Sequence, residues 1–591
     1  MDWQGWFTIA LTVSVLLTLV TVPRLSTDLV LMGALFVLSV TGILTPEQAL
    51  SGFSNSGLIT VAGMFVVAAG IRNSGGVDLI VERILGRPAG HRPALLRLMV
   101  PVALLSGFLN NTPVVATMIP AVSQWARRIR LPSSALMIPL SYASILGGTM
   151  TLIGTSTNLV VNGQYQALTG KEGFGLFAIT PIGMIAVLCG VTFVVLLAPI
   201  LLKARRSPDE TFADTRNFTF EVAVARDGPL VGKTIQEAGL RHLQRIYLAE
   251  IEREGAVITA VAPEETLRGG DRLVFVGETE AIVDILRING LVAAVGSKPA
   301  LERSVPERRL VEAVVAQHCE VVGSTVRDGN FRDRYGAVVL AVARNGEHIR
   351  GRLSSITLEA GDVLLLEARP AVMNRLRQSR DFLLMNELEH DLPDHSHAWL
   401  SWGILGAIVA LATFGVTSML NASLLGAALM LLTRCIKVSD ARRSLDLPVL
   451  ITIAASFALG NAIEQSGAAA FLGQGLLAAA GTNPWLLLGL TYLSVMTLTE
   501  MITNNAAAML MLPVVLAVTK TAGLNDIPYV ITVMMAASAS FATPIGYQCN
   551  LMVYGPGGYR FSDFFRIGIP MNLLMATVTI ISVPLLWPLQ G

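Results

Sequence analysis

Residues 110–120 read NNTPVVATMIP, and residues 503–513 read TNNAAAMLMLP. Further along each half comes a second matched pair, TLIGTSTNLVVNG at 151–163 and TPIGYQCNLMVYG at 543–555. Asn111 and Asn504 are 393 positions apart, and Asn158 and Asn550 are 392 apart, so one arrangement occurs twice. Polar, helix-breaking segments at matching places of two hydrophobic halves are the best sequence indication of a transporter's binding site.

The composition predicts a polytopic α-helical membrane protein. Of 591 residues, 53% are hydrophobic and 14% are charged, where a soluble protein carries about 25% charged residues. The net charge of +1 gives no indication of a nucleic-acid partner. The first twenty residues lack a basic start and a cleavage site, so we expect a first membrane helix and not a signal peptide. The four cysteines have no metal or disulfide spacing.

The chain divides into two apolar blocks, roughly 7–203 and 397–589, around a charge-rich insertion. Short alternating runs in the insertion, among them RIYLAEIE, RLVFVG, AVVLAVAR and DVLLLEA, predict strands. The insertion is itself duplicated, because VGKTIQEAGL at 231–240 matches VGSTVRDGNF at 322–331, and GGDRLVFVG at 269–277 matches AGDVLLLEA at 360–368. We therefore expect two membrane repeats and two small α/β domains, with boundaries at 1–204, 205–300, 301–395 and 396–591.

Basic residues predict the orientation of the membrane blocks. Lys and Arg collect in the loops of each block, at Arg72, Arg83, Arg87, Arg92, Arg97, Arg127, Arg128, Arg130, Lys203, Arg205, Arg206, Arg434, Lys437, Arg442, Arg443, Arg560 and Arg566. Placing all of them in the cytoplasm requires 98–126 to enter and leave on the cytoplasmic side and 484–520 to do so on the outer side. The halves then form an inverted repeat with about ten crossing helices, two re-entrant hairpins, a cytoplasmic insertion and an outside N-terminus.

The hairpin tips carry the candidate binding groups. Pro113 removes an N–H and disfavours helix at Thr112, so a break beside Asn110 and Asn111 would free backbone groups at bilayer depth. Thr503, Asn504 and Asn505 offer the same chemistry in the second half. Free carbonyls and side-chain oxygens suit a cation such as sodium, whereas free amides at helix N-termini suit an anion. The alternative is that these residues only join helices by hydrogen bonds.

Glu500 is an acid predicted inside a membrane segment, where acids are costly and usually functional. It is a possible coupling acid, attracting a cation or carrying a proton, or else a structurally paired carboxylate. Ser106 and Thr499 lie one helical turn before the two tips, so their hydroxyls are expected near them. No Ser/His/Asp, metal-ligand or phosphate-loop arrangement stands out, so the chain is not expected to be an enzyme.

These segments resemble the divalent anion/sodium symporter family of the ion transporter superfamily. The tips are similar to its Ser-Asn-Thr motifs, and GGTMTLIGTSTN at 147–158 is similar to its Gly-Thr-x-x-x-x-Gly-Thr-x-x-Asn stretch. The insertion resembles two tandem TrkA-C domains, the C-terminal module of regulators of potassium conductance (RCK). The resemblance implies a homodimer in the bacterial inner membrane, elevator-type alternating access, sodium as coupling ion, and TrkA-C domains that bind a small-molecule ligand or only dimerise.

The resemblance also implies a set of site residues. The substrate would contact Asn110, Asn111, Thr112, Thr503, Asn504 and Asn505. A first sodium site would use Ser106, Asn110, Asn111 and the backbone near Ser156. A second would use Thr499, the backbone at Ile502, Asn504 and the backbone around Gly546 and Tyr547. The tips read Asn-Asn-Thr and Thr-Asn-Asn, and this rearrangement of hydroxyls departs from the dicarboxylate pattern.

The leading prediction is sodium-coupled symport of a small divalent anion, with sulfate first and dicarboxylates such as succinate, malate or citrate next. One alternative is a proton- or sodium-driven anion antiporter or efflux permease that uses Glu500. Another is a ligand-gated channel built on the TrkA-C-like module, against which the repeat argues. A sensor that has lost transport is the fourth.

Overall fold

The computed structural model describes residues 1–590 except 23–24, 77–84, 87, 89, 203–218, 241–245, 254–255, 260, 262–263, 278–287, 294–308, 317–318, 345–346, 350–352, 369–371, 373–375, 377–378, 380, 388–396 and 482. The chain forms two compact units. One comprises Met1–Ala204, Leu392–Val553 and Arg560–Gly591, and the other comprises Arg205–Asp391 with Tyr554–Tyr559. Of the basic residues used for the orientation, Arg83, Arg87, Lys203, Arg205 and Arg206 lie outside the described residues.

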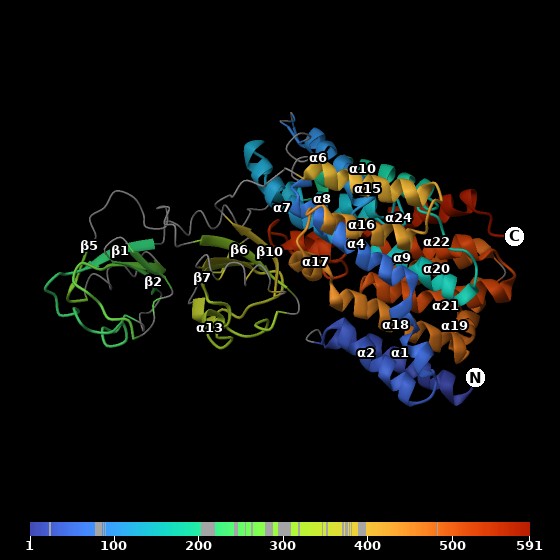
Figure 1. The fold of residues 1–591 in the computed structure, drawn as a ribbon, viewed down its shortest axis with the longest axis horizontal. Helices are drawn as coiled ribbons and strands as arrows, with labels where there is room; N and C mark the ends of the chain where they lie inside the picture. Colours follow the sequence, from blue (N-terminus) through green and yellow to red (C-terminus); the bar gives the residue numbers. More distant parts are fainter. Residues whose placement is uncertain are drawn as a thin grey trace. The chain divides into compact units, whose positions relative to one another are not determined.

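The first unit is helical, and its helices come from both ends of the chain (Figure 1). Its N-terminal half contains α1 (Trp3–Thr21), α2 (Thr27–Val40), α3 (Pro46–Leu50), α4 (Ser56–Asn73), α6 (His91–Ser106), α7 (Asn111–Arg128), α8 (Met137–Gly148), α9 (Ser156–Thr169) and α10 (Thr180–Leu201). Its C-terminal half contains α15 (Ala398–Thr413), α16 (Met419–Leu432), α17 (Val438–Ser444), α18 (Leu447–Gln465), α19 (Ala468–Ala480), α20 (Pro484–Thr499), α21 (Asn504–Ala522), α22 (Asp526–Ser538), α23 (Gln548–Tyr554) and α24 (Phe561–Leu586).

The duplication in the sequence reappears in the helices. Helices α6 and α20 begin at residues 91 and 484, which are 393 apart, and α2 and α16 begin at residues 27 and 419, which are 392 apart. The two halves also exchange partners, because α2 packs against α18 while α16 packs against α4, the counterpart of α18. Two similar halves therefore pack together as one body. That they run in opposite directions across the membrane stays a prediction.

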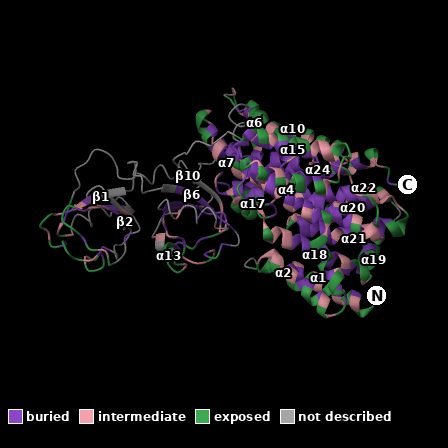
Figure 2. Ribbon diagram, in the orientation of Figure 1, coloured by how far each residue is buried: buried purple, intermediate pink, exposed green. Residues whose placement is uncertain are grey.

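The surface of the helical unit is apolar where helices face outward. Leu188 and Ile200 of α10 and Leu585 of α24 are 70%, 72% and 77% exposed, and Figure 2 shows buried residues concentrated inside the helical unit. Among the described residues, five segments are long and apolar enough to cross a membrane, or six if the bent pair α7 and α8 counts as one span. Seven further apolar helices are shorter, so the prediction of about ten crossings and two re-entrant hairpins is not tested by helix length.

The insertion contains two five-stranded antiparallel sheets. The first has the order β3-β2-β4-β1-β5 and the second β10-β6-β9-β7-β8. Their strands are β1 (Thr219–Val224), β2 (Ile246–Arg253), β3 (Ala256–Thr259), β4 (Arg272–Gly277), β5 (Leu291–Ala293), β6 (Arg309–Val315), β7 (Ala337–Arg344), β8 (Glu347–His348), β9 (Val363–Ala368) and β10 (Phe382–Glu387), with the short helix α13 (Phe331–Tyr335) in the second domain. Strands β2, β4, β7 and β9 lie where the sequence alternation predicts them.

Each sheet contains an arginine that pairs with an aspartate at the equivalent position. Arg253 binds the carboxylate of Asp271 through Nε at 2.9 Å and Nη2 at 2.8 Å, and Arg344 binds Asp362 through Nε at 2.7 Å and Nη2 at 2.8 Å. Both aspartates are 1% exposed. Hydrogen bonds to these aspartates raise the pKa of both arginines above the ordinary value. In each domain a bidentate pair with one buried partner therefore joins two neighbouring strands, β2 and β4 in the first and β7 and β9 in the second.

We expect Asp362→Asn to destabilise the second domain by about 3 kcal/mol, because it leaves the guanidinium of Arg344 without its buried countercharge. Glu359→Gln is the matched control. Glu359 binds the same arginine at 2.6 Å but is 62% exposed, so its loss is expected to cost about 1 kcal/mol or less. Urea unfolding of residues 205–391, followed by circular dichroism, measures both. Equal effects of the two substitutions would contradict this account.

Candidate functional site

Two helix breaks in the first unit carry the duplicated Asn segments. Helix α6 ends at Ser106 and α7 begins at Asn111, while α20 ends at Thr499 and α21 begins at Asn504. The first break differs from the expectation at one point, since Thr112 lies inside the first turn of α7. Pro113 is tolerated there because the first N–H groups of a helix have no partner within the helix.

In each half, a hydroxyl before the break binds the Asn after it. Ser106 Oγ lies 2.6 Å from Asn111 Oδ1, and Thr499 Oγ1 lies 2.8 Å from Asn504 Oδ1. Both pairs span five residues, and all four side chains were predicted as site residues. The expectation that each hydroxyl lies near its tip is therefore confirmed.

Each pair is joined by further oxygens from the helix that follows. Ser144 Oγ of α8 lies 2.9 Å from Ser106 Oγ and 3.3 Å from the carbonyl oxygen of Asn111. In the second half, Thr499 Oγ1 lies 2.8 Å from the carbonyl oxygen of Ala537 in α22. The partner lies 38 residues after the hydroxyl in both halves. Two small clusters of uncharged oxygens thus occupy equivalent positions.

Two more breaks lie downstream, between α8 and α9 and between α22 and α23. Asn158 donates through Nδ2 to the carbonyls of Gly148 and Thr151, at 3.4 and 3.2 Å. Asn550 donates in the same way to the carbonyls of Ser540 and Thr543, at 2.9 and 3.0 Å. Each Asn therefore satisfies carbonyls that have lost their helical partners.

Each tip makes its next contacts with the downstream break of the opposite half. Asn111 Nδ2 donates to the Tyr547 hydroxyl, and Thr112 Oγ1 donates to Gln548 Oε1 at 3.2 Å. Conversely, Asn505 accepts from Thr157 Oγ1 at 3.0 Å. Asn505 Nδ2 donates to Ser156 Oγ at 3.4 Å. The first tip thus lies on the second break, and the second tip lies on the first.

The Tyr547 hydroxyl is the point where both tips meet. Besides Asn111, it lies 3.4 Å from Thr155 Oγ1 and interacts with the side chain of Asn504. Asn111 and Asn504 are the first residues of α7 and α21, helices of 18 and 19 residues. Two helix N-termini, each the positive end of a helix dipole, therefore converge on one hydroxyl.

Glycines allow these close approaches. A Cβ on Gly148 would lie 2.6 Å from Asn111 Oδ1, and one on Gly154 would lie 2.9 Å from the Ser106 carbonyl oxygen. In the second half, a Cβ on Gly546 would collide with Ser540 Oγ. The Gly-Thr stretches recognised in the sequence thus leave room for the tips.

The other predicted residues occupy varied positions. Asn110 caps α7 with its backbone and is half-buried, while Thr503 accepts from the Ala506 amide at 3.4 Å and so caps α21. Ile502 is buried in an apolar cluster. The Gly546 amide donates to Thr543 Oγ1 at 3.0 Å. The structure joins Ser156 to Asn505, and the prediction had placed it with Ser106 and Asn111.

Sequence reasoning missed several side chains at this site. Ser144, Asn158 and Asn550 were not among the predicted residues, and Tyr547 was expected to contribute only backbone. The signal for Asn158 and Asn550 was present, because both occupy the same place in the matched segments. Nothing in the pattern around Ser144 marks it.

Glu500 forms the C-cap of α20 and accepts four hydrogen bonds. Two donors are the backbone amides of Ala542 and Thr543, at 2.9 and 3.1 Å. The other two are the Thr543 hydroxyl at 2.9 Å and the side-chain amide of Asn572 at 2.8 Å. These bonds tie the second tip to the downstream break of its own half. At the matching place of the first half, Thr151 binds the carbonyl of Gly107.

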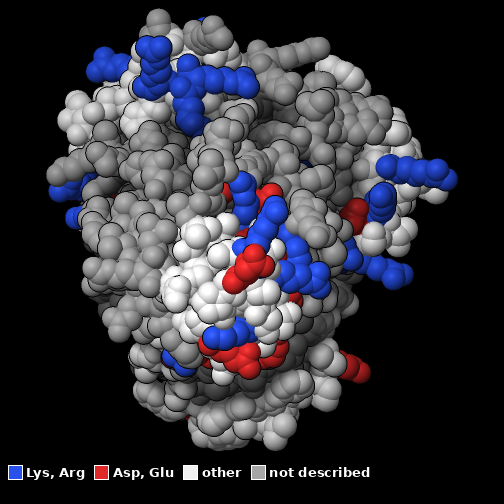
Figure 3. Space-filling view, turned by 90° about the vertical axis from the view of Figure 1, so that its left-hand side faces the viewer, with Lys and Arg blue, Asp and Glu red and all other residues white. Residues whose placement is uncertain are grey.

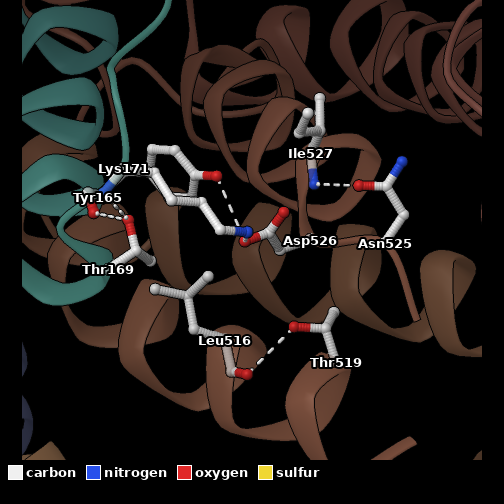
Figure 4. Close-up of polar contacts among 8 residues, drawn as sticks. All are labelled: Tyr165, Thr169, Lys171, Leu516, Thr519, Asn525, Asp526 and Ile527. Carbon is white, nitrogen blue, oxygen red and sulfur yellow. Dashed lines mark hydrogen bonds and ion pairs between the residues drawn. The ribbon is translucent and has the colours of Figure 1, made fainter. Parts of the chain in front are cut away.

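A second link between the halves lies away from the tips (Figure 4). Lys171, after α9, pairs with Asp526 of α22 at 2.6 Å, and Tyr165 OH donates to the same oxygen at 3.2 Å. The hydrogen bond to Asp526 raises the pKa of Lys171.

The tips themselves contain no Lys or Arg in 106–112 or 499–505. Figure 3 shows where charged side chains of both signs reach the surface on one face of the described residues.

A family model described as citrate transporter matches residues 9–515 and 422–589. The chain belongs to the citrate transporter family. It is thus a multi-pass membrane transporter of the ion transporter superfamily and not an enzyme. The family model does not show TrkA-C domains within the insertion, so the resemblance of the insertion to these domains stays a prediction.

The chain is also similar to three characterised or named proteins. It is 36% identical to a "Putative sulfur deprivation response regulator" of Chlamydomonas reinhardtii, over 94% of this chain and 97% of that protein. It is 27% identical to sodium/sulfate cotransporter 2 of the same alga, over 91% of this chain and 84% of that protein. It is 29% identical to the sodium-dependent dicarboxylate transporter SdcS of Staphylococcus aureus, over 33% of this chain and 40% of that protein.

In this family member, we expect Glu500→Gln to lower the midpoint of thermal unfolding, because an amide NH₂ would face donors that the carboxylate now satisfies. Fluorescence of the detergent-purified protein measures the midpoint at several pH values. Glu464→Gln is the control, since Glu464 is exposed and lies near the end of α18. A Glu500 variant of unchanged stability whose transport has lost its pH dependence would instead identify a proton-carrying acid.

Proposed function

We propose that this protein is a sodium-coupled symporter of a small divalent oxyanion, with sulfate as the leading substrate. The observation that carries the proposal is the convergence of two helix N-termini, those of α7 and α21, on the Tyr547 hydroxyl. Asn111 and Asn504, the first residues of these helices, both interact with this hydroxyl.

Converging N-termini favour a compact anion. The first amides of a helix lack helical acceptors, and the helix dipole adds partial positive charge at the same place. Without Lys or Arg at the tips, the anion is held by amides, hydroxyls and bound cations. Sulfate carries both charges on one small group, which suits one such centre. A four-carbon dicarboxylate separates its charges and needs two centres.

The two oxygen clusters are the proposed sodium sites. Ser106, Asn111 and Ser144 bring four oxygens together in the first half. Thr499, Asn504 and the Ala537 carbonyl bring three together in the second. Uncharged carbonyl, hydroxyl and amide oxygens suit sodium in transporters with broken helices. Sodium bound there places positive charge beside the anion, so the two bind cooperatively.

The name of the algal sodium/sulfate cotransporter supports both the ion and the substrate. By the resemblance noted above, we propose an inverted repeat with two re-entrant hairpins, working as a homodimer by an elevator mechanism in the bacterial inner membrane. The insertion would lie in the cytoplasm as two TrkA-C-like regulatory domains, 205–300 and 301–395, between membrane repeats 1–204 and 396–591.

A sodium-coupled dicarboxylate symporter is the second candidate, favoured by the partial match to SdcS. That match covers a third of the chain, whereas the sodium/sulfate cotransporter matches across both halves and the insertion. The four hydrogen bonds on Glu500 make it a fixed acceptor, so the antiporter that uses this residue as proton carrier is not the function we propose.

Radiolabelled sulfate uptake into proteoliposomes, with and without an inward sodium gradient, tests the proposal. We expect sodium-driven accumulation that thiosulfate or molybdate competes with and succinate does not. Sodium-driven succinate uptake in place of sulfate uptake would instead support the second candidate, a dicarboxylate symporter. Sulfate binding without uptake under any gradient would indicate a sensor.

We expect Thr499→Ala to raise the sodium concentration for half-maximal uptake by about tenfold, because it removes one oxygen from the second cluster. Thr497→Ala is the matched control. Thr497 lies on the same helix, is exposed, and donates to the Leu493 carbonyl at 2.8 Å. Initial rates of uptake across a series of sodium concentrations measure both variants. An unchanged sodium dependence in Thr499→Ala would remove this cluster from the sodium sites.

A further inference from the structure

The Tyr547 side chain departs from the duplication at the most central point of the site. Its counterpart in the first half is Thr155, 392 residues earlier, and the next pair is Ser156 and Gln548. Where the first half has two short hydroxyl side chains, the second half has a phenol and a longer amide. Thr151 and Asn158 keep their counterparts Thr543 and Asn550, whereas Thr149 and Thr157 correspond to Phe541 and Cys549.

The phenol reaches across to the other half. Tyr547 is 9% exposed, and its hydroxyl accepts from Asn111 Nδ2, lies 3.4 Å from Thr155 Oγ1 and interacts with Asn504. Thr155 and Tyr547, which are equivalent residues, therefore meet each other between the tips. With a threonine at 547, the two short side chains could not span this distance, and space between the tips would open.

The bridge also uses tip groups that a substrate would otherwise bind. Asn111 has its Oδ1 near Ser106 Oγ and its Nδ2 on Tyr547, so both ends of its carboxamide have a partner. Thr112 beside it is engaged by Gln548. In the described part of the chain, the half-buried Asn110 side chain and the first two backbone amides of each helix have no such partner, whereas the Ala506 amide is bound by Thr503.

We infer that Tyr547 is the residue that restricts the substrate to a compact oxyanion and excludes dicarboxylates. This inference rests on the proposed function and names what sets its specificity. The phenol fills the place between the tips where a second carboxylate would have to lie, and it occupies the amide that would bind that carboxylate. Rejecting a competitor by occupied space and engaged donors is a general means of specificity.

Tyr547→Thr, which copies the first half, tests the inference. The full-length protein is purified in detergent with sodium, and the rise in its unfolding midpoint is measured against sulfate and, separately, succinate. We expect succinate to stabilise Tyr547→Thr at a concentration about tenfold lower than wild type, since space and an amide donor become free. Tyr142→Phe is the control, because the Tyr142 hydroxyl donates to the Phe541 carbonyl at 2.7 Å.

If Tyr547→Thr does not fold, Tyr547→Phe tests the inference instead. This variant keeps the aromatic ring and removes the hydroxyl, so only the side-chain amides of Asn111 and Asn504 lose their partner. For that variant we expect a smaller gain for succinate, of about threefold. An unchanged succinate response in the folded variant would overturn the inference, whatever sulfate does. If sulfate fails to stabilise the wild type, the proposed function falls, and the comparison of succinate between variants still decides the role of Tyr547.

Discussion

The site depends on one constraint, which is that backbone groups freed at bilayer depth need partners inside the protein. Four breaks, at 107–110, 149–155, 500–503 and 539–547, interrupt helices of the first unit. Asn158 and Asn550 satisfy carbonyls at two of them, and Glu500 satisfies two amides. The polar residues at the tips and breaks are therefore required by the fold before they serve any ligand.

The two halves meet this constraint with different acceptors at one matching position. Thr151 in the first half bonds to the backbone carbonyl of Gly107, whereas Thr543, its counterpart, bonds to the carboxylate of Glu500. The second half therefore holds a negative charge beside its oxygen cluster, next to the N-terminus of α21. A carboxylate there stabilises the positive helix end, and it also attracts a cation. The two proposed sodium sites are thus expected to differ in affinity.

Sequence reasoning succeeded where a feature is repeated or periodic, and it did not identify contacts made across the halves. The pairs Ser106–Asn111 and Thr499–Asn504 follow from a helical turn before a matched motif, and the strands follow from alternation. The TPIGYQ segment at 543–548 was recognised only as half of a matched pair, and it contains the phenol that contacts the opposite half. The partner of a side chain that reaches into another helix depends on tertiary packing, which a single sequence does not encode locally.

The exchanged contacts also bear on how the site would move. Asn111 bonds to Tyr547, Asn505 bonds to Thr157, and Lys171 pairs with Asp526, so three separate contacts join residues of opposite halves. A motion that separated the two halves would break the buried hydrogen bonds of Asn111 and Asn505, each costing about 1–3 kcal/mol if left unsatisfied. Moving α7, α9, α21, α22 and α23 together preserves all three contacts. Alternating access by translation of one rigid group is therefore less costly for this arrangement than opening between its halves, and this supports the proposed elevator mechanism.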